Sequence, residues 1–335
     1  MKKICTAIIG LCIAMNVYGQ QDPMFTKYMF SSLTFNPAYA GAEDHLSLGL
    51  LHRTQWFGFG GRATPQTQSI TAHTPLKNER VGVGLQIMND VLGPTNTVGA
   101  NISYAYRIPM GKYKLAIGLQ GGGDYYTYDH TKITSETPGD LALDSDFNKF
   151  LPNFGTGIYF SKEKKFYIGL GIPKLIEWDL RAKSGGVTNP GQNARQVRHA
   201  FFTMGTAIPL NGDALIFKPS IMIRNSGLLS KFNKSKFYNN FAAPTSYDID
   251  LSMFFYQQLW LGAAFRGAID QSKGLGSASS VNAFAAYYLK SGLRIGTAYD
   301  YPLNKIQKAG TGSFELFVGY DFDYRVKKVV TPRYF

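Results

Sequence analysis

Histidine and cysteine would reveal chemistry most readily in this chain, and their spacing argues against an enzyme. The 335-residue sequence contains five histidines and two cysteines. None of the histidines has a metal-ligand spacing such as His-x-x-x-His. His52 and His73 fall near the ends of neighbouring predicted strands, where a Ser/His pair is conceivable, but no Gly-x-Ser-x-Gly or comparable nucleophile context accompanies them. We therefore predict no catalytic residue, no metal site and no cofactor.

Residues 1–19 have the pattern of a secretory signal peptide. Two lysines precede an apolar run over residues 4–15, and a small residue, Gly19, ends the segment. The apolar run is too short for a comfortable membrane-spanning helix. Both cysteines, Cys5 and Cys12, lie inside this leader, so the chain cleaved near Gly19 would have neither disulfides nor thiol chemistry.

The charge of the chain is strongly positive. Its formal net charge is +13 at pH 7, an excess that often indicates binding to nucleic acid. An exported chain rarely meets nucleic acid, so we expect no nucleic-acid partner. An anionic lipid headgroup or an acidic protein fits the charge better.

Period-two alternation of apolar residues with small or polar ones is the main structural signal. The stretches 80–88, 114–122 and 293–300 each place aliphatic or aromatic side chains on one face and mostly glycine, small or polar side chains on the other. The fourteen predicted strands are 45–54, 65–74, 80–90, 95–108, 112–128, 150–160, 164–172, 196–208, 213–225, 245–255, 257–268, 279–289, 291–301 and 312–324.

The connections between these strands favour a membrane barrel over a soluble sandwich, which alternation alone would also allow. Short connections alternate with longer ones rich in Gly, Pro and Asn, apart from a brief one at 91–94. The longer ones are 55–64, 129–149, 173–195, 226–244, 269–278 and 302–311. This alternation predicts an all-β fold: a transmembrane antiparallel β-barrel of about 14 strands, with short periplasmic turns and long extracellular loops. Strands of about 10 residues can cross a hydrocarbon core, and a closed sheet leaves no unpaired edge there.

The same alternation directs several basic residues into the barrel lumen, because an arginine facing lipid would cost about 2–4 kcal/mol. The candidate lumen cations are Arg53, Arg107, Lys218, Arg224, Arg266 and Arg294. They could form an anion-selective lining or a cradle for an acidic segment. We favour a structural role in which they pair with lumen carboxylates. The candidate carboxylates are Asp124, Asp248, Asp250, Asp300 and Glu315.

Four parts of the chain follow from this pattern: a signal peptide over 1–19, a periplasmic N-terminal segment over 20–44, the barrel over 45–324 and a C-terminal periplasmic tail over 325–335. The N-terminal segment is too aromatic to be a mobile tail. Its candidate plug residues are Phe25, Tyr28, Phe30, Phe35, Asn36, Pro37 and Tyr39. We predict that it folds into or across the periplasmic mouth as a plug and that the Asn-Pro turn delivers the last tyrosine to the first strand.

Three stretches resemble the PorP/SprF family of type IX secretion system membrane proteins. They are "QDPMFTKYMFSSLTFNPAYAGA" (21–42), "RTQWFGFGGRATPQTQSITAHTPL" (53–76) and "TPRYF" (331–335). The residues of the second stretch that match the family landmarks are Arg53, Gln55, Trp56, Gly58, Pro65, Thr67, Thr74, Pro75 and Leu76. Where the family commonly has Gly-Ala-Pro before the second strand, this chain has "GGRATP", so the local loop geometry differs.

The resemblance implies an outer-membrane barrel of the Bacteroidetes without catalytic residues. It also implies three kinds of partner: outer-membrane lipid, other type IX components in the periplasm and outer membrane, and a secreted client with a type B C-terminal domain. Adhesins of gliding motility are the best-known clients. The implied role is to assist export of the client or anchor it at the cell surface. A passive porin or small-solute channel with a basic lumen is the alternative.

Overall fold

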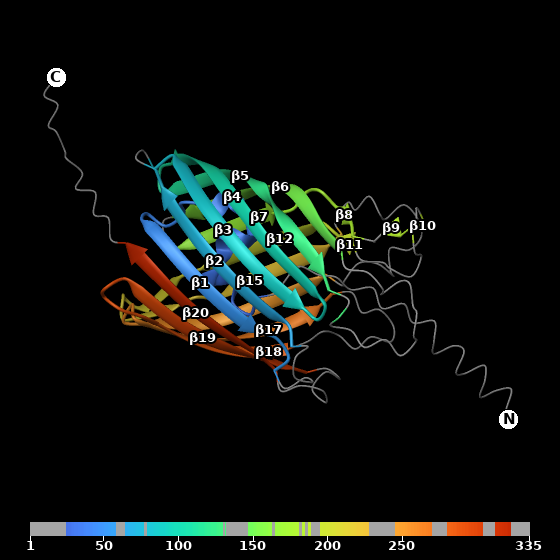
Figure 1. Cartoon of the computed structure of the whole chain (residues 1–335). Coiled ribbons are helices and arrows are strands. Elements are labelled where there is room, and N and C mark those ends of the chain that lie inside the picture. Colours follow the sequence, from blue (N-terminus) through green and yellow to red (C-terminus); the bar gives the residue numbers. More distant parts are fainter. Residues whose placement is uncertain are drawn as a thin grey trace, which may run out of the picture.

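A closed antiparallel β-barrel forms most of the chain in the computed structural model (Figure 1). The structure describes residues 25–57, 64–76, 79–129, 131, 147–162, 165–180, 183–184, 187–188, 195–227, 245–269, 280–303 and 312–322. The expected signal peptide with its cleavage site, Gly58 and the expected C-terminal tail lie outside these ranges. No helix in the described ranges is long and apolar enough to cross a membrane.

Sixteen strand segments make the barrel sheet. They are β1 (Leu46–Thr54), β2 (Gln66–Pro75), β3 (Val81–Leu92), β4 (Thr95–Met110), β5 (Tyr113–Tyr128), β6 (Phe147–Lys162), β7 (Phe166–Ile172), β12 (His199–Thr206), β13 (Ile208–Asn211), β14 (Leu215–Phe217), β15 (Ser220–Ser226), β16 (Ser246–Phe255), β17 (Leu259–Ala268), β18 (Ser280–Tyr288), β19 (Leu293–Pro302) and β20 (Ser313–Phe322). Four short strands lie in the long connection after β7: β8 (Trp178–Asp179), β9 (Lys183–Ser184), β10 (Val187–Thr188) and β11 (Arg195–Gln196).

The sixteen segments correspond to fourteen wall strands, as the sequence predicts. β13 continues β12, and β14 continues β15, because the pairs Gly205–Ser220 and Ile208–Phe217 lie in one unbroken register. Pro219 lies at the second interruption, where a residue without an N–H cannot donate to the ladder. The sheet closes through the pairing of β16 with β17, and β1 pairs with β20.

The wall strands alternate between an apolar outer face and a small or polar inner face. On β1, Leu48 and Leu50 point outward and are exposed, whereas Ser47, Leu51 and Arg53 point inward and are buried. The outer band continues around the barrel with residues such as Ile102, Ile117 and Phe154. Such a band faces lipid in outer-membrane barrels.

The two ends of the barrel differ in their connections. At the end called here the short-turn end, hairpins such as β4–β5 and β16–β17 turn over two or three residues. Gly111 adopts a φ of 65° in the first of these turns, a conformation that glycine allows without strain. The opposite, long-loop end carries the longer connections and the short strands β8–β11 (Figure 1).

Residues 25–42, called here the inner segment, lie inside the barrel (Figure 1). They form η1 (Tyr28–Phe30), α2 (Ser32–Phe35) and η2 (Pro37–Tyr39). A buried core joins the segment to the wall. It consists of Phe25, Tyr28 and Phe35 with the wall residues Leu51, Met88, Phe201 and Met222. The barrel therefore has a packed centre supplied by residues that precede its first strand.

Glycines on the inner face make room for this segment. An added Cβ at Gly82, Gly118 or Gly171 would lie less than 3.0 Å from backbone atoms of residues 35–41. These glycines belong to β3, β5 and β7, so the segment touches much of one side of the wall. Alternation alone would allow any small residue at these positions. The close approach of the inner segment leaves room only for glycine.

Candidate functional site: the occupied barrel interior

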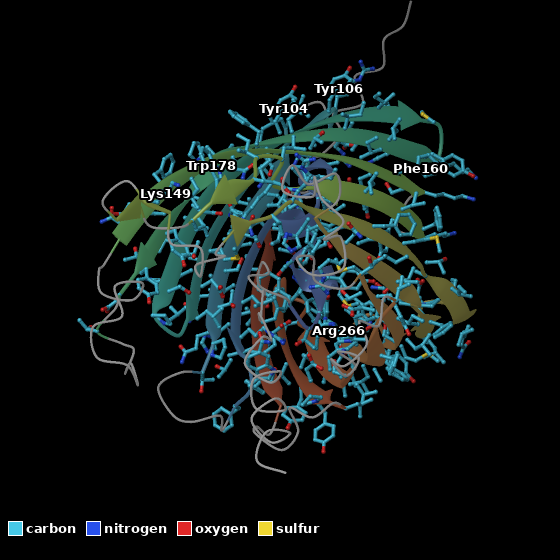
Figure 2. The ribbon with its side chains drawn as sticks, turned by 90° about the vertical axis from the view of Figure 1, so that its right-hand side faces the viewer. Tyr104, Tyr106, Lys149, Phe160, Trp178 and Arg266 are labelled. Carbon is cyan, nitrogen blue, oxygen red and sulfur yellow. The ribbon has the colours of Figure 1, made fainter. Side chains whose placement is uncertain are left out.

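The inner segment begins in a cluster of buried ion pairs. The Lys27 ammonium pairs with the Asp250 carboxylate of β16, and both side chains are 1% exposed. Next to them, Arg266 of β17 donates to Asp248 from Nε at 2.6 Å and from Nη2 at 2.8 Å. The same Nη2 donates to the carbonyl of Phe25 at 2.9 Å. Figure 2, a view from the long-loop end, labels Arg266 within the ring of strands.

A second group of contacts joins the segment to the seam between β1 and β20. The Glu315 carboxylate accepts the backbone N–H of Thr26 at 2.7 Å and that of Lys27 at 3.2 Å. Arg53 donates to the Thr26 hydroxyl and lies 3.4 Å from Glu315 and 3.6 Å from Asp300. Arg53 and Glu315 are also register partners across the seam.

These contacts form an ionic cluster in which the charges balance. Four cations face four carboxylates, all of them buried: Lys27, Arg53, Arg224 and Arg266 against Asp248, Asp250, Asp300 and Glu315. Without the inner segment, the wall residues of the cluster would carry one excess negative charge. Burial lowers the pKa of the Lys27 ammonium, and the neighbouring Asp250 carboxylate opposes that shift. The arrangement fits the structural role for the lumen cations.

Aromatic packing holds the middle of the inner segment. The Phe30 ring stacks on Phe317 with a centroid distance of 4.5 Å and meets Trp260 edge-on at 5.4 Å. The Tyr28 hydroxyl donates to Ser220 Oγ at 2.7 Å, which satisfies its polar end. Aromatic pairs of this kind contribute about 0.5–1.5 kcal/mol beyond their buried area. The predicted plug residues Phe25, Tyr28 and Phe30 thus all contact the inner wall.

The Asn-Pro pair at the end of the segment starts a short helix and fixes it to the wall. Asn36 Oδ1 accepts the N–H of Ala38 at 3.0 Å, and its Nδ2 donates to the Ile158 carbonyl at 3.0 Å. Pro37 follows as the first residue of η2, a position that suits its fixed φ. The Tyr39 ring packs edge-on against Tyr159 at 5.4 Å, and its hydroxyl donates to Glu43 at 3.0 Å. Tyr39 therefore stays inside the barrel and chain residues 40–45 lead to β1.

The depth of the inner segment differs from the predicted location at the short-turn mouth. Its last residues do lie at that end, with Ala40 against Gly82 at the start of β3. Its first residues reach the other half of the barrel, because Thr26 contacts Arg53 near the end of β1 that leads to a long loop. The ionic cluster accounts for this depth, since the partners of Lys27 and Thr26 lie in that half of the wall.

The remaining predicted basic residues also have partners. The Lys218 ammonium lies 3.6 Å from the centroid of the Trp260 ring. Arg294 pairs with Asp321 at 2.8 Å, and Arg107 lies 3.6 Å from Asp44 at the short-turn end. Arg224 lies 3.9 Å from Asp248. The interior of the described barrel is therefore more nearly neutral than a basic channel lining would be.

The family-motif residues Gln55, Trp56, Pro65 and Thr67 lie at the long-loop end of the wall, whereas Thr74, Pro75 and Leu76 lie at the short-turn end of β2. Thr67 is buried and donates to Asp90 at 2.6 Å, and the N–H of Gln55 donates to the Pro65 carbonyl at 2.9 Å. Trp56 has a φ of 55° and donates its N–H to Ser313 of β20 at 3.3 Å. A positive φ at a bulky residue is strained and is tolerated where surrounding contacts impose it.

Sequence reasoning missed a second segment inside the barrel, because it assigned 173–195 to an extracellular loop. The beginning of this connection folds against the inner faces of β5 and β6. Asn153 exchanges two hydrogen bonds with the backbone of Ile176, at 2.8 and 2.9 Å, and Lys174 pairs with Asp124 at 2.7 Å. An inward-facing glycine, Gly155, where a Cβ would meet Pro173, was the available signal.

The cavities found beside the inner segment in the described part of the barrel are small. Two cavities border it, with volumes of about 10 and 20 Å³. A single water needs roughly 10–15 Å³ of such volume, so these cavities hold no more than isolated waters. Among the described residues, no group of three or more His, Cys, Asp or Glu side chains could hold a metal ion.

The histidines that could have formed a Ser/His pair are not brought together. His73 is buried on the inner face beside the Tyr39 ring, at a centroid distance of 5.3 Å. His52 lies on the opposite face of the wall, where its ring contacts Thr54 and Gln68.

A closed antiparallel wall with an apolar outer band and a filled polar interior defines an outer-membrane β-barrel. Solved structures of that class are similar to it. The CymD monoaromatic hydrocarbon channel matches with a TM-score of 0.52 and 12% identity, over 90% of this chain and 94% of that one. A Pseudomonas aeruginosa FadL homologue matches with a TM-score of 0.49 and 14% identity, over 87% and 94%. The Acinetobacter baumannii outer membrane protein Omp33 matches with a TM-score of 0.45 and 9% identity, over 83% and 99%. At 12% identity, the match to CymD shows a shared fold alone.

The sequence decides the family within this class. Residues 17–320 match the family described as "Type IX secretion system membrane protein PorP/SprF". The chain belongs to the PorP/SprF family, and its place is the outer membrane. No curated protein sequence matches it. The motif stretches 21–42 and 53–76 fall within the matched region, whereas the ending 331–335 lies beyond it.

Proposed function

We propose that this protein is a non-enzymatic outer-membrane partner of the type IX secretion system that assists export of a secreted client or anchors it at the cell surface. The client would carry a type B C-terminal domain, as gliding-motility adhesins do. Family membership supports the link to secretion, and the filled interior supports a holding role. The observation that carries the proposal is the ionic cluster, because it fixes the inner segment to the barrel wall.

A passive porin is the weaker candidate. A porin needs a continuous aqueous path, and the two cavities found beside the inner segment among the described residues are large enough for isolated waters only. Opening such a path would separate Lys27 from Asp250 and leave a buried charge without compensation, at a cost of about 3–5 kcal/mol. Purified protein reconstituted in planar bilayers should therefore show no steady conductance.

Gene deletion tests the proposal directly. We expect one specific secreted protein to disappear from the cell surface, either retained in the cell or released into the medium, while other type IX clients remain displayed. Surface proteomics of the deletion strain and of a strain complemented with the wild-type gene measures this. Unchanged display of every client would refute the secretion role, and steady conductance of the purified protein would favour the porin.

A further inference from the structure

The net positive charge of the chain does not come from the ionic cluster inside the barrel. The ionic cluster around the inner segment is balanced, and Lys218, Arg107 and Arg294 each have an aromatic or acidic partner. The sequence nevertheless carries a formal net charge of +13. Part of that excess must therefore act outside the lumen, and the described surface shows where some of it lies.

Three lysines gather at the short-turn end of two neighbouring hairpins. Lys112 lies in the β4–β5 turn, Lys162 ends β6 and Lys165 closes the β6–β7 turn, with its N–H bonded to the Lys162 carbonyl at 3.0 Å. Tyr113 and Lys162 are register partners, so the two turns are adjacent. None of the three lysines has a carboxylate within 4.0 Å in the described ranges. We call them the rim lysines.

A neighbouring lysine, Lys114, differs from the rim lysines because carboxylates neutralise its charge. Lys114, two residues after Lys112, lies 3.3 Å from Asp44 and 3.8 Å from Glu79. Acidic side chains are therefore present at this end of the barrel, and they pair with Lys114 and Arg107. Among the described residues the rim lysines have no acidic partner, so their charge is available to an external one.

An outward-facing aromatic surface adjoins the rim lysines. The rings of Tyr113 and Phe160 stack at 5.4 Å, and the Lys162 ammonium lies 5.4 Å from the Tyr113 ring centroid. Tyr104 and Tyr106 continue this surface on β4, and Figure 2 shows both on the outer side of the wall. Tyr113 begins β5 at the short-turn end, and tyrosines at strand ends sit at the level of lipid headgroups. The Lys162 stem can lie along its ring while the ammonium stays in the headgroup region.

The arrangement is local to this part of the rim. The β16–β17 turn presents Tyr256 and two glutamines, and the β13–β14 turn presents Asp213. Lys290 stands in the β18–β19 turn. The described β13–β14 and β16–β17 turns contain no lysine and the β18–β19 turn contains one, so the three rim lysines form a distinct patch among these turns.

We propose that Lys112, Lys162 and Lys165 bind the phosphate of an anionic phospholipid headgroup in the periplasmic leaflet. Short turns of outer-membrane barrels face that side. Ammonium groups attract anionic headgroups, and the stacked rings of Tyr113 and Phe160 would support the adjoining glycerol and upper acyl chain. An acidic protein segment is the less suitable occupant, because the lysines border a surface that lipid already covers.

Lipid competition measures the proposed binding. Full-length protein is delipidated and titrated with phosphatidylglycerol or phosphatidylcholine, and bound lipids are counted by native mass spectrometry. We expect preference for phosphatidylglycerol in the wild type and a loss of at least about tenfold in that preference for K112Q/K162Q/K165Q. The variant K290Q/K305Q/K308Q removes the same charge elsewhere and should keep the preference. Heat-modifiable gel migration verifies that both variants are folded.

Three results would overturn the proposal. The first is full preference for phosphatidylglycerol in the rim variant. The second is an equal loss in the control variant, which would assign the effect to net charge. The third is a wild type that does not distinguish the two lipids but binds polyglutamate through the rim lysines, which would make an acidic protein the occupant.

Discussion

Replacing Lys27 by methionine tests whether the inner segment is a structural part of the barrel. The substitution keeps most of the side-chain volume but removes the ammonium that pairs with Asp250, where both side chains are 1% exposed. It also removes a cation held 4.5 Å from the Phe284 ring. Breaking a buried pair by removing one partner costs about 3–5 kcal/mol, because the remaining charge stays buried. We expect K27M to lower the free energy of unfolding in lipid vesicles by that amount, measured by guanidinium titration.

The double variant K27M/D250L distinguishes loss of the pair from loss of packing. Apolar replacements of both partners are often neutral, so this variant should recover most of the stability. Lys165→Met, at an exposed turn, should change the free energy by no more than about 0.5 kcal/mol. A K27M protein as stable as the wild type, or a double variant no better than K27M, would refute the assigned role of the ionic cluster.

Three further substitutions test other parts of the structure. Gly118→Val places side-chain atoms where the Ala38 backbone lies, so folded yield in heat-modifiable gels should fall sharply; normal yield would show that the inner segment does not pack there. Phe30→Ala should cost about 3–5 kcal/mol in the same titration, whereas Phe57→Ala, at 63% exposure, should cost little; equal costs would contradict the assigned packing. Ile102→Arg puts a charge on the outer band and should destabilise the barrel in vesicles by about 2–4 kcal/mol, and a neutral result would argue that this face does not meet lipid.

The wall could be predicted because its rules are local. Alternation and turn length are visible within ten residues of sequence, and they gave every wall strand, including the two that Pro219 and Ala207 interrupt in the structure. They also gave the inward direction of Arg53 and Arg266. The assignment of 173–195 as a single external loop was wrong in part, because the inward fold of Pro173 depends on one glycine of the neighbouring strand, Gly155 of β6.

The depth of the inner segment could not be predicted for a related reason. Its aromatic residues indicate burial, but no local pattern identifies the partner of a single lysine. Asp250 is 223 positions from Lys27, and Glu315 is 289 positions from Thr26. The sequence shows that both carboxylates face the lumen, and only the closed barrel brings them to the start of the chain.

The order of assembly is constrained by the contacts that join Arg53, Glu315 and Thr26. Strand β20 is the last to be synthesised, and its Glu315 binds both the first wall strand and the residues ahead of it. Contacts of such long sequence separation form late, after the entropy of closing the whole chain has been overcome. We therefore expect closure of the β1–β20 seam and docking of the inner segment to occur together, so an assembly intermediate captured with β1 and β20 apart should have the inner segment accessible to protease.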